Sequence, residues 1–204
     1  MKKKIIFLLA ACLFVAAAII GISGCLKAEE INFAHLLNPD GEKNIFMFFF
    51  TNLGAAYGVI PVAAILLMLP KKKQIALPVA VAVTSSWLVN TAVKVIVRRP
   101  RPAEMLLEEH SFSFPSGHAM NNAALYFAII ICLLPLCKKL WQRVAVWCLA
   151  PLPIIIGLTR VYFNVHYISD VVAGWSLGLI IALVCCDAVL KKGELLCLKK
   201  QNSK

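Results

Sequence analysis

The sequence alternates between long apolar stretches and short charged segments, and this alternation restricts the fold more than any other feature. A helix needs roughly 20 apolar residues to cross the ~30 Å hydrocarbon core of a membrane. Six stretches approach or exceed that length, at residues 5–26, 45–69, 75–97, 117–136, 144–160 and 167–190. With 61% hydrophobic and 15% charged residues, the composition is also that of a membrane protein. We therefore predict an all-α, integral membrane six-helix bundle that forms a single domain over residues 1–204.

The basic residues are distributed unevenly between the two sides of this bundle. If the N-terminus is cytoplasmic, fourteen of the 21 lysines and arginines fall on the cytoplasmic side, as the positive-inside rule requires. Both termini are then cytoplasmic (N-in and C-in). The topology also explains the net charge of +11, because the basic residues form short runs between spans and not one basic and aromatic surface. We expect no nucleic-acid partner.

The first apolar stretch has two interpretations. The basic segment Lys2–Lys4 and the uncharged run after it are typical of a retained first span and also of a signal peptide. The segment Ile22–Cys25 resembles a bacterial lipoprotein processing site, at which cleavage would leave Cys25 lipidated. Both interpretations stay open. The eight cysteines include no CxxC pair, so we expect most of them to be packing residues and not a zinc site or a disulfide framework.

Two segments beside the spans carry local signals. Residues 27–44 are predicted to form a polar loop with a turn at residues 38–41. The apolar residues in its middle suit either a surface segment or a packed loop, and they are Ile31, Phe33, Leu36 and Leu37. Pro151 and Pro153 should kink or locally open the fifth stretch near its start.

Three polar clusters interrupt the apolar pattern on the outer side, at Lys94–Pro102, Pro115–His118 and Thr159–Asp170. Ionisable residues at such positions are energetically expensive and usually functional. Five of the seven basic residues assigned to the outer side lie in or beside these clusters. The clusters are therefore predicted to form one site, which requires positive charge, at the extracytoplasmic membrane boundary.

Two of the clusters have a defined chemistry. Ser116, Gly117 and His118 open a helix, where a serine can cap, a glycine admits a ligand to the backbone, and first-turn amides favour an anion. His166 and Asp170 are four residues apart and share one helix face. The carboxylate can therefore hold one imidazole nitrogen as a donor and leave the other as an acceptor or nucleophile.

Together the clusters resemble the three signature motifs of the type 2 phosphatidic acid phosphatase family. The motifs are Lys94-x6-Arg101-Pro102, Pro115-Ser116-Gly117-His118 and Arg160-x5-His166-x3-Asp170, in the family's order and spacing. The similarity covers about residues 90–175 by motif and the six-span layout by architecture. One position departs from the family pattern, because Thr159 stands where a serine is usual, although threonine keeps the hydroxyl.

The resemblance implies a metal-independent membrane phosphatase without a cofactor, acting through a phosphohistidine intermediate. His166 would be the nucleophile, Asp170 its orienting partner, and His118 the general acid and then base. The phosphoryl oxygens would be held by Lys94, Arg101, Arg160, Ser116 and Gly117. Three cations and helix-terminal amides suit phosphoryl transfer, which depends on positioning and charge stabilisation. Arg98 and Arg99 are expected to be solvated flanking charges, with contact to a diphosphate or an anionic headgroup as the alternative.

A site at the membrane boundary would admit a lipid phosphate sideways from the outer leaflet, so the expected partners are membrane lipids. By analogy within the family, the first expectation is undecaprenyl pyrophosphate, followed by phosphatidylglycerol phosphate or phosphatidic acid. The sequence leaves the oligomeric state open.

Alternative functions use the same basic site. A phosphotransferase would pass the phosphoryl group from His166 to a lipid or sugar acceptor. A non-catalytic membrane protein could bind anionic lipids there, although it would have no need for a paired His166 and Asp170. A transporter is disfavoured because no ionisable group lies near the middle of a predicted span. Soluble vanadium haloperoxidases share a similar motif set, but six apolar stretches argue against that branch.

Overall fold

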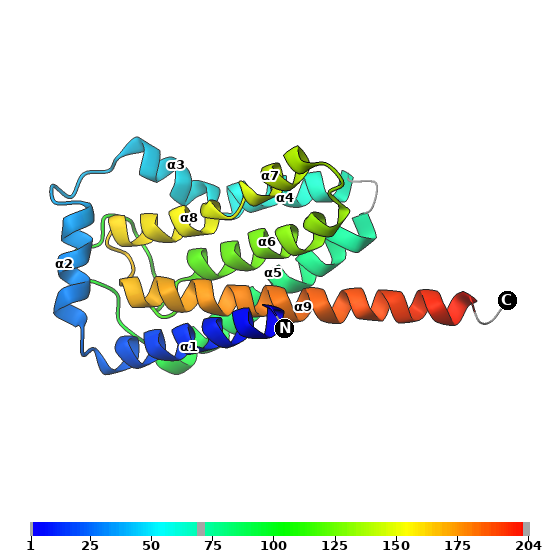
Figure 1. The fold of residues 1–204 in the computed structure, drawn as a ribbon. Helices are drawn as coiled ribbons and strands as arrows, with labels where there is room; N and C mark the ends of the chain where they lie inside the picture. The colour runs from blue at the N-terminus through cyan, green and yellow to red at the C-terminus, as the bar shows by residue number, and fades with distance from the viewer. Residues whose placement is uncertain (1, 69–71, 202–204) are drawn as a thin grey trace.

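The structure is a computed structural model that describes residues 2–68 and 72–201, and all regular elements within these residues are helical (Figure 1). The elements are α1 (Lys2–Ser23), α2 (Lys27–Leu37), α3 (Ile45–Leu53), α4 (Ala56–Met68), α5 (Lys72–Val97), α6 (Gly117–Leu133), η1 (Leu134–Leu136), α7 (Leu140–Trp147), α8 (Pro151–Tyr162) and α9 (Ile168–Gln201). The long helices lie side by side along one direction, and α2 crosses one end of them (Figure 1). The all-α prediction is confirmed.

Five segments of the described chain are long and apolar enough to cross a membrane. They are Lys3–Ser23, Ile75–Val97, Gly117–Leu136, Leu140–Tyr162 and Ile168–Lys191. They correspond closely to five of the six predicted stretches. The chain is therefore a multi-pass membrane protein, as predicted.

The remaining predicted span, residues 45–69, is not one continuous helix. α3 ends at Leu53 and α4 begins at Ala56, and residue 69 lies outside the described part of the chain. At the break, the side-chain amide of Asn122 donates a hydrogen bond to the carbonyl oxygen of Gly54 (2.8 Å). Gly54 also lies against α8, where a Cβ would be 2.3 Å from Cγ2 of Ile156. A tertiary contact thus replaces the helix's own hydrogen bond and interrupts the span.

The segment predicted as a polar loop is largely a helix, α2, which lies over the end of the bundle (Figure 1). The two residues that it buries are Glu30 and Ala34. Ala34 packs with Val161 of α8 and Val171 of α9. α2 is therefore anchored to the ends of two long helices, and one of its two buried residues is a carboxylate.

α6 is the central helix of the bundle and packs against α5, α8 and α9. Its closest approach is to α9, where a Cβ on Gly178 would lie 2.3 Å from the carbonyl oxygen of Met120. Small residues permit such backbone contact between membrane helices. The amide of Ser116 donates a hydrogen bond to the carbonyl oxygen of Asp170 (2.9 Å). The start of α6 and the start of α9 are consequently held together at one end of the bundle.

The fifth predicted stretch is interrupted beside its prolines. α7 ends at Trp147 and α8 begins at Pro151, with turn residues at 148–150. Proline favours the first position of a helix because it lacks the N–H that would be unpaired there. The predicted opening near Pro151 and Pro153 is confirmed. Beyond it, α8 carries Arg160 to the end of the bundle at which α6 and α9 begin.

Candidate active site

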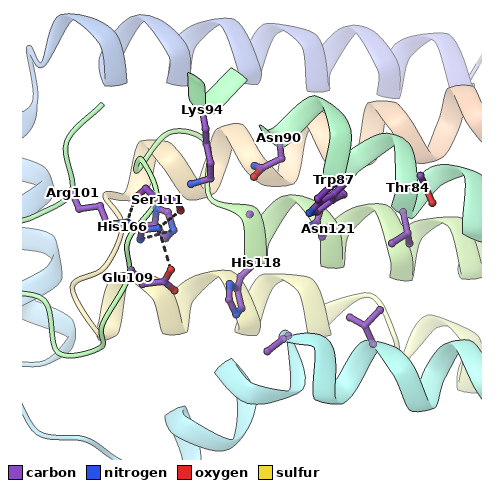
Figure 2. Close-up of a pocket in the computed structure, with 15 residues that line it drawn as sticks. Thr84, Trp87, Asn90, Lys94, Arg101, Glu109, Ser111, His118, Asn121 and His166 are labelled. Atoms are coloured by element: carbon purple, nitrogen blue, oxygen red, sulfur yellow. Dashed lines mark hydrogen bonds and ion pairs between the residues drawn. The ribbon is translucent and has the colours of Figure 1, made fainter. Parts of the chain in front are cut away.

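The three motif segments meet around a cavity of about 600 Å³ at the α2 end of the bundle. Figure 2 shows its polar side chains, which come from α5, the loop between α5 and α6, α6 itself, and the turn before α9. Five of the predicted site residues line the cavity, namely Lys94, Arg101, Gly117, His118 and His166. The other three, Ser116, Arg160 and Asp170, are buried directly behind it. The structure thus brings the predicted residues together.

The contacts of His166 define its tautomer. Nε2 of His166 lies 3.1 Å from Nη1 of Arg101, and because a guanidinium can only donate, Nε2 carries the lone pair. The proton of the neutral ring is then on Nδ1, which lies 3.3 Å from the hydroxyl of Ser113 and 3.5 Å from Oδ2 of Asp170. The acceptor nitrogen lies on the Arg101 side of the ring, and the protonated nitrogen lies on the carboxylate side.

The surroundings of His166 keep its ring neutral. The residue is 2% exposed, and burial lowers its pKa to about 3, although the hydrogen bond and charge of Asp170 act in the opposite direction. The positive charge of Arg101 adds to the effect of burial. The neutral imidazole is the form that can act as a nucleophile, so His166 is in that form at neutral pH.

Asp170 lies in the first turn of α9 and is completely buried. Its Oδ2 accepts hydrogen bonds from the hydroxyl of Ser113 (2.5 Å) and the backbone amide of Tyr167 (3.0 Å). Its Oδ1 accepts a hydrogen bond from Nη1 of Arg99 (2.6 Å). These contacts hold the carboxylate on the Nδ1 side of His166, with the Ser113 hydroxyl bridging the two groups.

His118 lies in the first turn of α6 and lines the same cavity as His166 (Figure 2). Its backbone carbonyl accepts a hydrogen bond from the side-chain amide of Asn122 (2.8 Å). The same amide donates to the carbonyl oxygen of Gly54 between α3 and α4. The two histidines therefore reach one cavity from separate segments, as the sequence predicts.

A carboxylate lies between two of the predicted phosphate-binding arginines. Glu109 pairs with Nη2 of Arg101 (3.3 Å) and makes a short contact with Nη2 of Arg160. Arg160 is 2% exposed, and its Nη1 donates a hydrogen bond to the hydroxyl of Thr51 in α3 (2.6 Å). Arginines bind carboxylate and phosphate oxygens through the same forked geometry. Glu109 thus occupies donors of both arginines, which the sequence predicts to bind phosphoryl oxygens.

Arg101 and Lys94 are held in place by backbone carbonyl groups. Arg101 donates hydrogen bonds to the carbonyl oxygens of Ser111 (2.6 Å) and Val165 (2.8 Å), so its guanidinium has a fixed orientation. The ammonium of Lys94 donates a hydrogen bond to the carbonyl oxygen of Phe112. Both cations line the cavity and are connected to the loop before α6.

The start of α6 differs from expectation in one respect. Ser116 is the N-cap residue, but its side chain makes no capping hydrogen bond. Its hydroxyl oxygen and Nε of Arg160 are both buried without a hydrogen-bond partner among the described residues. Buried polar atoms are normally paired, so these two donors depart from the usual pattern.

Thr159, the one departure from the family pattern, faces away from this chemistry. It is completely buried, and its hydroxyl donates a hydrogen bond to the carbonyl oxygen of Ile156 one turn earlier in α8 (2.6 Å). The threonine therefore satisfies its hydroxyl within its own helix and leaves Arg160 in place.

Arg99 is not the solvated flanking charge that the sequence indicates. It is 7% exposed, and its guanidinium joins Asp170 (2.6 Å) to Glu30 of α2 (2.7 Å). It also lies 4.1 Å from the ring centroid of Tyr167. The prediction is wrong for Arg99 because α2, predicted as a loop, folds over this segment and buries it. For Arg98, which is exposed, the prediction is confirmed.

Four residues of this region lie outside the predicted site, namely Glu30, Arg99, Glu109 and Ser113. A polar residue two positions before Pro115 of the second motif is a signal that the sequence offers for Ser113. Glu109 is one of three carboxylates in residues 104–109, and nothing in the sequence distinguishes it from the others. Glu30 lies 69 residues from Arg99, its partner, so only the fold connects them.

The cavity continues away from the charged residues along α4 and α5. Its walls there are formed by Ala55, Val59, Val83, Thr84 and Trp87. An apolar channel that ends in a cluster of cations matches the two parts of a lipid phosphate, the chain and the headgroup.

Comparison with known proteins gives a consistent assignment. Residues 75–194, more than half of the chain, match the family model described as the PAP2 superfamily. The chain is 33% identical over 176 residues to phosphatidylglycerophosphatase B of Bacillus subtilis (strain 168). The aligned region covers 82% of this chain and 86% of the relative. It is 29% identical over 142 residues to undecaprenyl-diphosphatase of Sulfolobus acidocaldarius, which covers 66% of this chain and 65% of that relative.

Solved structures have the same fold. The crystal structure of a transmembrane PAP2-type phosphatidylglycerolphosphate phosphatase from Bacillus subtilis superposes with a TM-score of 0.75 and 27% identity, over 90% of this chain and 94% of that one. LpxE of Aquifex aeolicus superposes with a TM-score of 0.56 and 26% identity, over 78% and 93% of the two chains. The resemblance inferred from the motifs is therefore confirmed, and the chain belongs to the PAP2 superfamily as a membrane lipid phosphatase.

Proposed function

We propose that the chain removes the terminal phosphate of a membrane lipid through a phosphohistidine on His166, without a metal ion. The observation that carries this proposal is the orientation of the His166 ring. Its lone pair is on Nε2, beside Arg101, and its proton is on Nδ1, toward Asp170. A histidine that only packs or binds anions requires no such arrangement, whereas a nucleophilic histidine does.

In the first step, the Nε2 lone pair of His166 forms a bond to phosphorus, and the bond from phosphorus to the lipid oxygen breaks. The electron pair of that bond stays on the lipid oxygen, which takes a proton from His118 acting as general acid. Nδ1 of His166 keeps its proton. The positive charge that the ring acquires is stabilised by the carboxylate of Asp170.

In the second step, His118 takes a proton from a water molecule whose oxygen bonds to phosphorus. The bond from phosphorus to Nε2 breaks and returns the lone pair to His166. In both steps the phosphoryl oxygens would be held by Lys94, Arg101, Arg160, the Ser116 hydroxyl and the Gly117 amide. Glu109 has to leave the two arginines before the phosphoryl group can occupy their donors.

For the substrate, we rank phosphatidylglycerol phosphate first and undecaprenyl pyrophosphate second, with phosphatidic acid third. Analogy within the family, on which the first expectation rests, favours undecaprenyl pyrophosphate. The reversed order is supported by the Bacillus subtilis relative, which is matched over more of both chains than the Sulfolobus undecaprenyl-diphosphatase. Any of these lipids would place a chain along α4 and α5 and a phosphate at the cations.

For the topology, we propose N-in and C-in, with the site on the extracytoplasmic face and residues 45–68 crossing the membrane as a broken helix. The support is the charge asymmetry and the position of the N-terminus, which lies at the opposite end of α1 from α2 and the site (Figure 1). Labelling intact cells with a membrane-impermeant maleimide tests this proposal. His110→Cys in a Cys25→Ser background should react from outside, and reaction only after lysis would reverse the orientation.

The proposed chemistry is tested by phosphate release from the three lipids by purified protein in detergent with EDTA. Release should persist in EDTA and be lost in His166→Ala and His118→Ala. His35→Ala changes a histidine of α2 outside the cavity and is the matched control, so it should retain activity. A brief reaction with a ³²P-labelled lipid should leave label on the protein that is stable to base and labile to acid, and His166→Ala should remove it.

The outcomes separate the competing functions. Loss of release in EDTA, restored by a divalent cation, would overturn the metal-independent mechanism. Transfer of label to an added lipid or sugar alcohol in preference to water would identify a phosphotransferase. Binding of the lipids without release, by a folded protein, would leave an anionic-lipid binding protein.

A further inference from the structure

Three buried charged residues, Glu30, Arg99 and Asp170, are joined by ion pairs behind His166. Of these three, only Asp170 belongs to the family motifs. Arg99 lies between Asp170 and Glu30, with its Nη1 2.6 Å from Oδ1 of Asp170 and its Nη2 2.7 Å from Oε2 of Glu30. The three residues are 7%, 0% and 4% exposed, in the order Arg99, Asp170 and Glu30. Buried charges are costly to desolvate, so they need a reason to be in this position.

The second oxygen of Glu30 is bonded to the start of α9. Oε1 of Glu30 accepts a hydrogen bond from the backbone amide of Ser169 (2.8 Å), the residue directly before Asp170. Nη1 of Arg99 also donates to the hydroxyl of Ser169 (2.7 Å). Glu30 and Arg99 thus hold both the backbone and the side chain next to the carboxylate that faces His166.

The charges of Glu30, Arg99 and Asp170 do not cancel. Two carboxylates share one guanidinium, which leaves one negative charge in a buried region. Although burial acts against the charged guanidinium, Asp170 and Glu30 raise the pKa of Arg99 above its ordinary value. The excess negative charge lies next to Nδ1 of His166, where the ring becomes positive when Nε2 forms its bond to phosphorus. If Arg99 paired with Asp170 alone, the guanidinium would balance the negative charge of this carboxylate. Because Glu30 accepts from the same guanidinium, part of the negative charge of Asp170 stays unbalanced.

We propose that Glu30 and Arg99 are positioning residues for phosphoryl transfer, which hold Asp170 against Nδ1 of His166 and keep that pair negatively charged. This inference rests on the function proposed above. It makes α2, a surface helix outside the family match at residues 75–194, part of the catalytic apparatus.

The test replaces Glu30 by glutamine, which keeps an oxygen for the Ser169 amide and puts an uncharged NH₂ group in place of the oxygen that accepts from Arg99. Glu30→Gln should lower kcat on the order of 100-fold, the usual scale of a misplaced catalytic group, with KM for the lipid phosphate unchanged. The matched control is Glu29→Gln, which changes the exposed neighbour on α2 and should behave as wild type. Arg99→Lys keeps the buried charge but loses the fork that reaches both carboxylates, so it should also lower kcat. Arg98→Lys is its exposed control.

Two further measurements separate positioning from general stability. In Glu30→Gln, formation of the ³²P-phosphohistidine in a single turnover should slow as much as kcat does, whereas a protein that is only less stable would keep its rate per folded molecule. In a double-mutant cycle, Glu30→Gln with Arg99→Gln should lose no more activity than the worse single variant, because Glu30 acts through Arg99.

The inference is overturned if Glu30→Gln keeps the wild-type kcat, or if its loss of activity only follows the fraction of folded protein measured by size exclusion and thermal unfolding. Its failure is distinguishable from failure of the proposed function. If wild-type release does not depend on His166, the proposed function fails. If release depends on His166 but Glu30→Gln matches Glu29→Gln, only the role of Glu30 and Arg99 fails.

Discussion

Glu109, which lines the cavity, is ion-paired with the buried Arg160. The same carboxylate reaches Arg101 at 3.3 Å, so it occupies donors of both arginines at once. The resting site therefore neutralises part of its own positive charge with a residue from the loop between α5 and α6. A phosphate that binds to both arginines has to displace this carboxylate, which opposes the binding of any anion.

Removing the charge of Glu109 should therefore strengthen anion binding. Glu109→Gln is expected to lower the inhibition constant of inorganic phosphate on the order of tenfold, the effect of one hydrogen bond between charged groups. Inhibition of lipid hydrolysis by phosphate measures it. Glu108→Gln, a change in the exposed neighbour, should leave the constant unchanged. An unchanged or higher constant in Glu109→Gln would show that the carboxylate does not compete with phosphate.

The low pKa of His166 makes the folded state sensitive to acid. The buried ring stays neutral down to about pH 3, whereas in the unfolded chain it takes a proton below its ordinary pKa of 6.5. The unfolded state thus binds more protons between these values, and stability falls as the pH falls below 6.5. From pH 7 to pH 5 this amounts to about 2 kcal/mol.

Thermal unfolding in detergent at pH 7 and pH 5 measures this effect by comparing wild type with His166→Gln. The wild type should lose more stability between the two pH values than the variant, which has no group to titrate at this position. Equal losses would mean that His166 is protonated in the folded protein. His35→Gln, which changes a histidine on α2, is the control and should behave as wild type.

The contact between Gly178 and Met120 leaves no room for a side chain. Gly178→Val is expected to separate the backbones of α6 and α9 and to lower the free energy of unfolding by about 1–3 kcal/mol. Because Met120 lies in the first turn of α6, beside His118, kcat should fall as well. Thermal unfolding and lipid hydrolysis check the two effects. Val184→Leu, which adds volume at an exposed position of α9, should change neither.

Trp87 forms part of the apolar wall of the cavity, so it should contribute to binding of the lipid chain. Trp87→Ala is expected to raise KM for a long-chain lipid phosphate roughly 3- to 10-fold, through lost apolar contact. KM for a short-chain, water-soluble analogue should not change. Trp141→Ala, at an exposed tryptophan of α7 that does not line the cavity, is the control. Equal effects on both substrates would show that the lipid chain does not bind at Trp87.

Local chemistry explains which parts of the fold are predictable. The five membrane-span candidates follow from apolar length, because a membrane helix needs little more than a run of apolar residues. The interruption at Pro151 follows from the missing N–H of proline. The break at Gly54 does not follow from its own segment. It depends on Asn122, which lies 68 residues away and takes the carbonyl that a continuous helix would use.

The same division holds for the site. The identity and spacing of the residues in the three motifs are properties of the chain, and the motifs together are sufficient to indicate phosphoryl-transfer chemistry and its family. The tautomer of His166, its low pKa, and the pairing of Arg99 with Glu30 are not properties of any single segment. They arise from desolvation and from charges contributed by distant residues, and these interactions exist only once α2, α6 and α9 have packed around one cavity.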